Sequence, residues 1–85
     1  MDQTIITLYT RAHCHLCETA KETILELKRN WDFILEEIDI DQSDDLTERY
    51  GLMIPVVLVD GNEVGFGYID QFEVCKRLRQ KNQAF

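Results

Sequence analysis

Two cysteines three residues apart, Cys14 and Cys17, lie where a short apolar run meets a segment of helical periodicity. The run from Thr4 to Tyr9 is β-branched, apolar and aromatic, which predicts a strand, and we expect it to be buried on both faces. Apolar residues then recur at spacings of three and four and predict a helix: Cys14, Cys17, Ala20, Ile24, Leu27 and Trp31. This stripe predicts that Cys17 lies deeper in the core than Cys14, which begins the helix and can reach solvent.

The middle of the chain predicts a second strand and a short helix. Residues Phe33 to Ile40 alternate apolar and acidic side chains, as in a strand with one wetter face. Ser43 is a favourable first cap for a helix, and Gly51 is typical of a helix end. We therefore expect a short helix between Ser43 and Gly51.

The last third of the chain predicts a hairpin followed by a helix. The valine-rich run Val56–Val59 leads into Asp60-Gly61, a strong signal for a tight hairpin turn, and the chain returns through Val64 and Phe66. Asp70 is a candidate helix cap. The helix that follows is expected to bury three side chains, Phe72, Cys75 and Leu78.

The order of these elements predicts an α/β fold. It reads β-α-β-α-β-β-α, with a parallel first pair of strands joined by a crossover helix and an antiparallel hairpin. We expect a four-stranded mixed sheet flanked by helices. The 85 residues are sufficient for one core, so residues 1–85 are interpreted as a single domain.

The charge of the chain argues against nucleic acid as a partner, and its hydropathy argues against a membrane span. Sixteen acidic residues against nine basic ones give a formal net charge of −7, which argues against binding nucleic acid. No segment is apolar for long enough to span a membrane, and Met1-Asp2-Gln3 lacks the basic character of a signal peptide. These features predict a cytoplasmic location, where a cysteine pair indicates redox catalysis or metal binding rather than a structural disulfide.

The spacing of Cys14 and Cys17 suits reversible disulfide chemistry. Residues three apart in a helix have Cα atoms about 5–6 Å apart, within the range that a disulfide tolerates. Unpaired N–H groups and the dipole at a helix start lower the pKa of a cysteine there, so Cys14 is the predicted nucleophile. The more buried Cys17 is the predicted resolving thiol.

Two alternatives to redox catalysis remain open from the residues alone. Cys14 and Cys17 with His13 or His15 could bind Zn²⁺ or Cu⁺, or the cysteines could be inert members of the core. As cations, His13 and His15 would favour a Cys14 thiolate, although both could equally be solvated loop residues. Cys75 is interpreted as a small apolar residue of the last helix, with a regulatory thiol as the alternative.

The stretch from Leu8 to Cys17, together with Ile54-Pro55 before a valine strand and a hairpin, resembles the glutaredoxin-like branch of the thioredoxin superfamily. The similarity extends over nearly the whole chain and is greatest to short proteins with a Cys-x-Leu-Cys site. It implies a thioredoxin fold, with Cys14 as nucleophile and Cys17 as resolving thiol. It also implies a cis peptide bond before Pro55, with the backbone of Ile54 pairing with substrate.

The same resemblance implies a substrate site around the dithiol. Arg11 matches a basic residue that meets a glutathione carboxylate, and Met53 replaces a threonine that lies two residues before the proline. Gly65-Phe66 is similar to a pair in redoxins that thioredoxin reductase reduces. The full predicted set is Arg11, His13, His15, Met53, Ile54, Pro55, Gly65 and Phe66.

The implied substrates are protein disulfides or glutathione mixed disulfides. The implied electron donor is glutathione or thioredoxin reductase, because His15-Leu16 and the segment Gly65–Asp70 depart from the glutathione-using pattern and leave the choice open. We expect no bound cofactor or metal, and a monomer.

Overall fold

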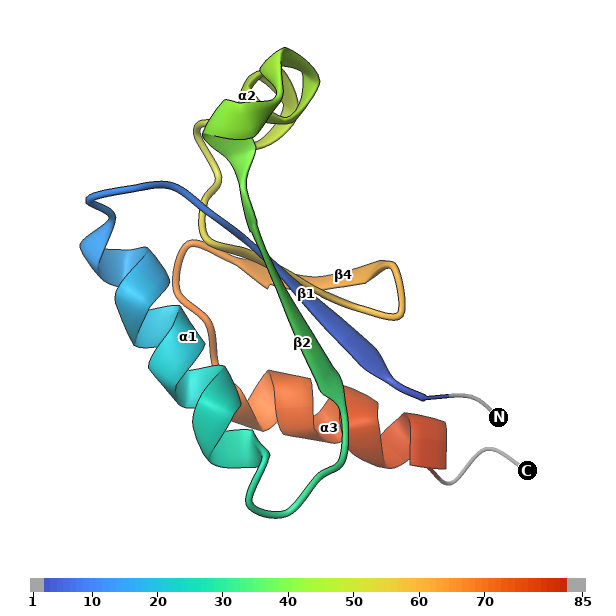
Figure 1. Cartoon of the computed structure of the whole chain (residues 1–85). Helices are drawn as coiled ribbons and strands as arrows, with labels where there is room; N and C mark the ends of the chain where they lie inside the picture. The colour runs from blue at the N-terminus through green and yellow to red at the C-terminus, as the bar shows by residue number, and fades with distance from the viewer. Residues whose placement is uncertain (1–2, 83–85) are drawn as a thin grey trace.

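A computed structural model of the chain describes residues 3–82. Its elements, coloured along the chain in Figure 1, are β1 (Ile5–Thr10), α1 (His15–Leu27), β2 (Ile34–Asp39), the short 3-10 turn η1 (Ile40–Gln42), α2 (Asp44–Tyr50), β3 (Val56–Val59), β4 (Asn62–Phe66) and α3 (Gln71–Asn82). The predicted order β-α-β-α-β-β-α is confirmed, with η1 as an addition between β2 and α2.

The four strands form one mixed sheet in the order β2-β1-β3-β4. The strand β1 runs parallel to β2 and antiparallel to β3, and β4 returns antiparallel to β3. Asp60 and Gly61 make the hairpin turn with φ of 50° and 85°, the left-handed conformation that such a turn requires. The sheet brings the ends of β1 and β2 and the start of β3 to one edge of the molecule, where the dithiol lies.

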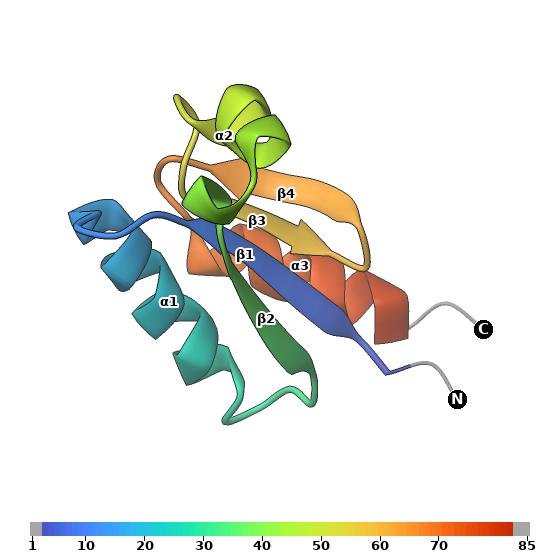
Figure 2. The same cartoon turned by 45° about the horizontal axis from the view of Figure 1, so that its top comes forward.

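The helices α1 and α3 cover the same face of the sheet (Figures 1 and 2), and one core joins them to it. On the sheet this core contains Ile6, Leu8, Val57 and Val59, and on the helices it contains Ala20, Ile24, Leu27, Val74 and Leu78. The helix α2 lies beyond the end of the sheet, where Tyr50 stacks on Tyr9 of β1 with ring centroids 4.6 Å apart. None of the helices within residues 3–82 has the length and apolar character needed to cross a membrane.

The expectation that β1 is buried on both faces is wrong. Ile6 and Leu8 are fully buried, whereas Ile5, the first residue of the strand, is 36% exposed. The physical reason is the one-sided helix layer, because α1 and α3 cover only the face that carries Ile6 and Leu8. On the opposite face, Tyr9 stacks on Tyr50 of α2.

Two details of the predicted helices differ in the structure. Trp31 lies beyond the end of α1 at Leu27, although it still packs against the core. Phe72 was expected inside but is 64% exposed, because the inward face of α3 is defined by Val74 and Leu78, one turn apart. Residue 72 is two positions from Val74 and therefore points to nearly the opposite side of the helix.

Candidate functional site

Cys14 caps the N-terminus of α1. Its backbone is extended (φ −106°, ψ 107°), and its Sγ accepts the N–H of Cys17 at 3.2 Å. The preceding residue, His13, has a φ of 60°, a left-handed conformation that is uncommon for a residue other than glycine. This turn directs the chain from the end of β1 into α1 and places the Cys14 sulfur over the helix start.

Cys14 and Cys17 are joined as a disulfide, with their Cα atoms 5.2 Å apart. The two side chains differ in access, since Cys17 is 3% exposed whereas Cys14 is only partly buried. The predicted difference in depth is therefore confirmed. The Cys14 sulfur is therefore more accessible from solvent than the Cys17 sulfur.

The helix start favours negative charge on Cys14. The first N–H groups of a helix have no partner within it, and the helix dipole places partial positive charge at this end. The N–H of Cys17 already points at the Cys14 sulfur. When the disulfide opens, the same donor can stabilise a Cys14 thiolate, the form in which a cysteine acts as a nucleophile.

A cavity of about 350 Å³ lies on the β2 side of the dithiol. It is lined by Thr10, Arg11, His13, Cys14, Cys17, Glu18, Lys21, Glu22, Leu25 and Glu37. Both of its long basic side chains have carboxylate partners. The Arg11 guanidinium donates to both oxygens of Asp41 at 3.0 and 3.2 Å, and Lys21 Nζ lies 3.0 Å from Glu37.

The peptide bond between Ile54 and Pro55 is cis, as the resemblance implied. The loop after β4 is bonded to this segment, because the Gly67 N–H donates to the carbonyls of Pro55 at 2.8 Å and Met53 at 3.1 Å. Gly67 adopts a φ of 72°, which favours glycine. The bonds hold the loop after β4 against the proline segment.

The structure separates the predicted substrate residues into two groups. Arg11 and His13 share the cavity that contains both cysteines. Met53 and Ile54 are partly buried beside Pro55, in the segment to which the loop after Gly65-Phe66 is bonded. His15 is the first residue of α1 and is exposed, outside the cavity on the β2 side.

Sequence reasoning missed two residues near the dithiol, Leu16 and Tyr68. They line a smaller cavity of about 80 Å³ between α1 and the loop after β4. Both are large apolar or aromatic residues that stay exposed, at 52% and 77%. The sequence carried a signal for Leu16, because it is an apolar residue between the two cysteines that does not belong to the inward stripe of α1.

The structure gives no support to the alternative of a three-ligand metal site. Within residues 3–82, no three histidine, cysteine or acidic side chains lie close enough to hold a metal ion. The two histidines flank Cys14 in the sequence, but the fold does not gather them with the cysteines into such a set.

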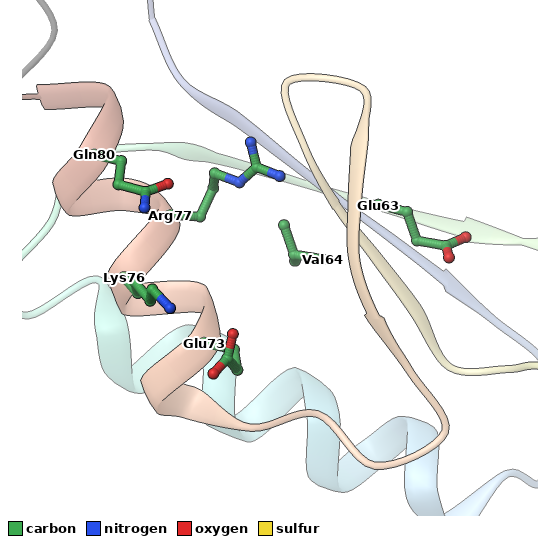
Figure 3. A pocket seen from close by; sticks show the side chains of 6 residues that line it. All are labelled: Glu63, Val64, Glu73, Lys76, Arg77 and Gln80. Carbon is green, nitrogen blue, oxygen red and sulfur yellow. The ribbon is translucent and has the colours of Figure 1, made fainter.

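Another cavity of about 350 Å³ lies between β4 and α3, far along the chain from Cys14 and Cys17. Figure 3 shows Arg77 extending from α3 toward the hairpin, while Glu63 points away from the helix. Its lining residues are Glu63, Val64, Glu73, Lys76, Arg77 and Gln80, which include no cysteine or histidine. This cavity therefore adds no group to the dithiol site.

Comparison with known proteins agrees with the fold. A protein from Mycobacterium tuberculosis, described only as uncharacterized, is 32% identical over 76 residues, which are 84% of this chain and 78% of that protein. The solution structure of protein Ne2328 from Nitrosomonas europaea is 28% identical, with a TM-score of 0.80, covering 92% of this chain and 94% of that one.

A thioredoxin variant from Halobacterium salinarum has the same fold. It is 18% identical, with a TM-score of 0.73, covering 99% of this chain and 79% of that one. The sequence profile of the family described as "Glutaredoxin-like domain (DUF836)" matches residues 5–82. The chain therefore belongs to this glutaredoxin-like family of the thioredoxin superfamily.

Proposed function

We propose that this protein is a dithiol thiol–disulfide oxidoreductase. The observation that carries the proposal is the placement of Cys14 as the cap of α1, with its sulfur accepting the N–H of Cys17 and forming a disulfide with that residue. Family membership supports the same chemistry. The pair can close and open across a Cα separation of 5.2 Å, so little backbone movement is needed.

In the proposed reaction, the Cys14 thiolate attacks one sulfur of a substrate disulfide. A mixed disulfide forms between Cys14 and the substrate, and the other substrate sulfur leaves as a thiolate that takes up a proton. The Cys17 thiolate then attacks the Cys14 sulfur, which closes the disulfide of the protein and releases the second substrate thiol. The net result is the transfer of two electrons and two protons from the dithiol to the substrate.

The substrates are protein disulfides or glutathione mixed disulfides, and the spent pair is reduced again by glutathione or thioredoxin reductase. We place this activity in the cytoplasm, because a reducing compartment returns the cysteine pair to its dithiol form. The protein is proposed to act as a monomer. Oxidised protein offered to each donor in parallel discriminates between the donors. The physiological donor is the one that regenerates free thiols on Cys14 and Cys17 at the higher rate.

The activity itself is tested by reduction of insulin or bis(2-hydroxyethyl) disulfide with three single variants. Cys14→Ser is expected to lower the rate to that of the reductant alone. Cys17→Ser is expected to accumulate a mixed disulfide on Cys14, visible as an increase in intact mass. Cys75→Ser is the matched control, because Cys75 lies on α3 outside the site, and it should retain the wild-type rate.

A wild-type protein that reduces neither substrate with any donor would contradict the proposal. Activity that survives in Cys14→Ser would contradict the assignment of the nucleophile.

A further inference from the structure

An ion-paired arginine lies beside the dithiol. Arg11 lines the cavity on the β2 side together with Cys14 and Cys17, and its side chain is 35% exposed. It directly follows β1 and comes three residues before Cys14. A free cation in this place would attract a substrate that carries carboxylates next to its disulfide. Whether Arg11 acts in this way depends on what its guanidinium already contacts.

The guanidinium of Arg11 is bonded to Asp41 through two of its nitrogen atoms. Arg11 Nε donates to Asp41 Oδ1 at 3.0 Å and to Oδ2 at 3.2 Å, and Arg11 Nη2 lies 3.0 Å from Oδ1. Such paired contacts with a carboxylate are stronger and more directional than a single one. The same Nη2 lies near Gly51, where α2 ends, because a Cβ added at that glycine would be 3.9 Å from it. The cation is therefore held at η1 and the end of α2.

Asp41 belongs to a turn whose backbone is itself fixed. It lies in η1, which begins at the fully buried Ile40. The Asp41 N–H donates to the Asp39 carboxylate at 2.9 Å. The Ile40 carbonyl accepts the Ser43 N–H at 3.2 Å and the Thr47 hydroxyl at 2.8 Å. The turn thus presents the Asp41 carboxylate from an anchored position, and the flexible arginine side chain meets it there.

The second long base of this cavity is also paired, since Lys21 Nζ lies 3.0 Å from Glu37. A substrate carboxylate on this side of Cys14 therefore meets two bases that already contact carboxylates. To bind it, Arg11 would have to leave Asp41. That exchange loses one ion pair for each one gained, and it leaves the Asp41 carboxylate near a second negative charge, which repels it.

From these contacts we infer that Asp41 is a specificity-determining residue: by holding Arg11, it disfavours disulfides that carry carboxylates next to the attacked sulfur. The inference rests on the proposed function and narrows its substrate class to disulfides with neutral or positively charged surroundings. The covalent steps are unchanged. The Cys14 thiolate attacks one substrate sulfur, the other leaves and takes up a proton, and Cys17 then closes the disulfide of the protein, so both electrons come from the dithiol.

The test uses reduced full-length protein, freed of the dithiothreitol that reduced it, and three small disulfides of similar length. Dithiodipropionate carries two carboxylates, bis(2-hydroxyethyl) disulfide is neutral, and cystamine carries two ammonium groups. Oxidation of Cys14 and Cys17 is followed by acid quenching, alkylation and mass measurement. The readout is the rate with dithiodipropionate divided by the rate with the neutral disulfide. Comparing this ratio between each variant and the wild type cancels the intrinsic reactivities of the disulfides.

Asp41→Asn is expected to raise this ratio about three- to fivefold, which is the effect of an exposed ion pair at the upper end of the usual range. The ratio of cystamine to the neutral disulfide should fall, because the released guanidinium repels ammonium groups. High salt should weaken both changes. The rate with the neutral disulfide reports any general effect of the substitution on the dithiol, and the ratio removes that effect.

Two further variants show whether the effect passes through the arginine. In an Arg11→Gln background, Asp41→Asn should change the ratio by less than about twofold, because no guanidinium is released. Glu22→Gln is the matched charge control, since Glu22 lines the same cavity and pairs with no basic side chain in the described part of the chain. It also removes one negative charge, and it should change the ratio by less than about twofold.

Three results would overturn the inference: an unchanged ratio in Asp41→Asn, an equally large increase in the Arg11→Gln background, or an equally large increase in Glu22→Gln. In each of these cases the wild type would still be oxidised by the neutral disulfide, so the proposed function would stand without the inference. The failure of the proposed function looks different. None of the three disulfides would then oxidise the dithiol of the wild type, and the substrate preference would fall with the activity.

Discussion

At the scale of single residues, the site depends on where one sulfur lies relative to one N–H. The Cys17 N–H reaches the Cys14 sulfur at 3.2 Å because Cys14 is the cap residue and not a member of the first turn. A Cys14 thiolate would thus be stabilised by a backbone donor that remains in place with any residue other than proline at position 17.

This geometry predicts that the pKa of Cys14 in the folded, reduced protein is lower than that of the same cysteine in the unfolded chain. The cause is the Cys17 N–H together with the positive end of the α1 dipole. A chain carrying Cys17→Ser and Cys75→Ser has Cys14 as its one thiol, so the pH dependence of its alkylation by iodoacetamide reports on Cys14 alone.

The midpoint of that profile is expected at lower pH in buffer than in concentrated urea, which serves as the control. A midpoint that is equal or higher in the folded protein would contradict the assigned stabilisation.

The dithiol and the cis bond before Pro55 could be predicted from the sequence, whereas the ion pair and the smaller cavity beside the dithiol could not. The positions of Cys14 and Cys17 follow from local periodicity, since the helix stripe alone places residue 17 inward. The pairing of Arg11 with Asp41 and the joint lining of one cavity by Leu16 and Tyr68 depend on contacts between residues 30 and 52 positions apart in the chain. Helical and strand periodicity carry no information about such contacts.

At the scale of elements, α1 connects the redox site to the core. Its inward stripe of Cys17, Ala20, Ile24 and Leu27 is buried, so the same periodicity that builds the core also sets the depth of Cys17. The periodicity that predicted this face is a local property of the helix. The exposure of Phe72 on α3 could not be read in the same way, because several apolar faces were possible there and packing against the sheet selected the one with Val74 and Leu78.

The inward stripe of α1 predicts a large difference between two neighbouring substitutions. Ile24→Ala removes a fully buried side chain and should lower the free energy of unfolding by about 2–5 kcal/mol. Leu25→Ala, the matched control, truncates a side chain that is 44% exposed and should change it by less than about 0.5 kcal/mol. Urea denaturation of the oxidised proteins measures both. Similar losses in the two variants would show that α1 is not docked through the Ile24 face.

At the scale of the whole molecule, α1 and α3 cover one face of the sheet, whereas the opposite face is partly open, with Ile5 36% exposed and Val56 buried. Short-range rules predicted the parallel crossover from β1 to β2 and the tight hairpin between β3 and β4, and both are confirmed, whereas the sequence did not predict the pairing of β1 with β3. The open face was missed because the residues of β1 are β-branched and apolar on both sides, which is equally typical of a strand in the middle of a fully covered sheet. Only the position of α2 beyond the end of the sheet distinguishes the two arrangements.

Two adjacent residues of β1 test this one-sided architecture with the same substitution. Ile6→Thr places a hydroxyl group in the core, where Ile6 is 0% exposed, and also removes a methyl group, so we expect a loss of about 2–4 kcal/mol in the free energy of unfolding. Ile5→Thr makes the same change on the open face, where Ile5 is 36% exposed, and should cost less than about 1 kcal/mol because the hydroxyl keeps contact with water.

Threonine retains the β-branched shape, so strand propensity is nearly constant across the pair and the difference between the two losses reports on burial. Denaturant titration of each variant beside the wild type gives that difference. Equal losses at the two positions would mean that a further layer covers Ile5 in solution. A difference of the expected size would indicate that Ile5 contacts water.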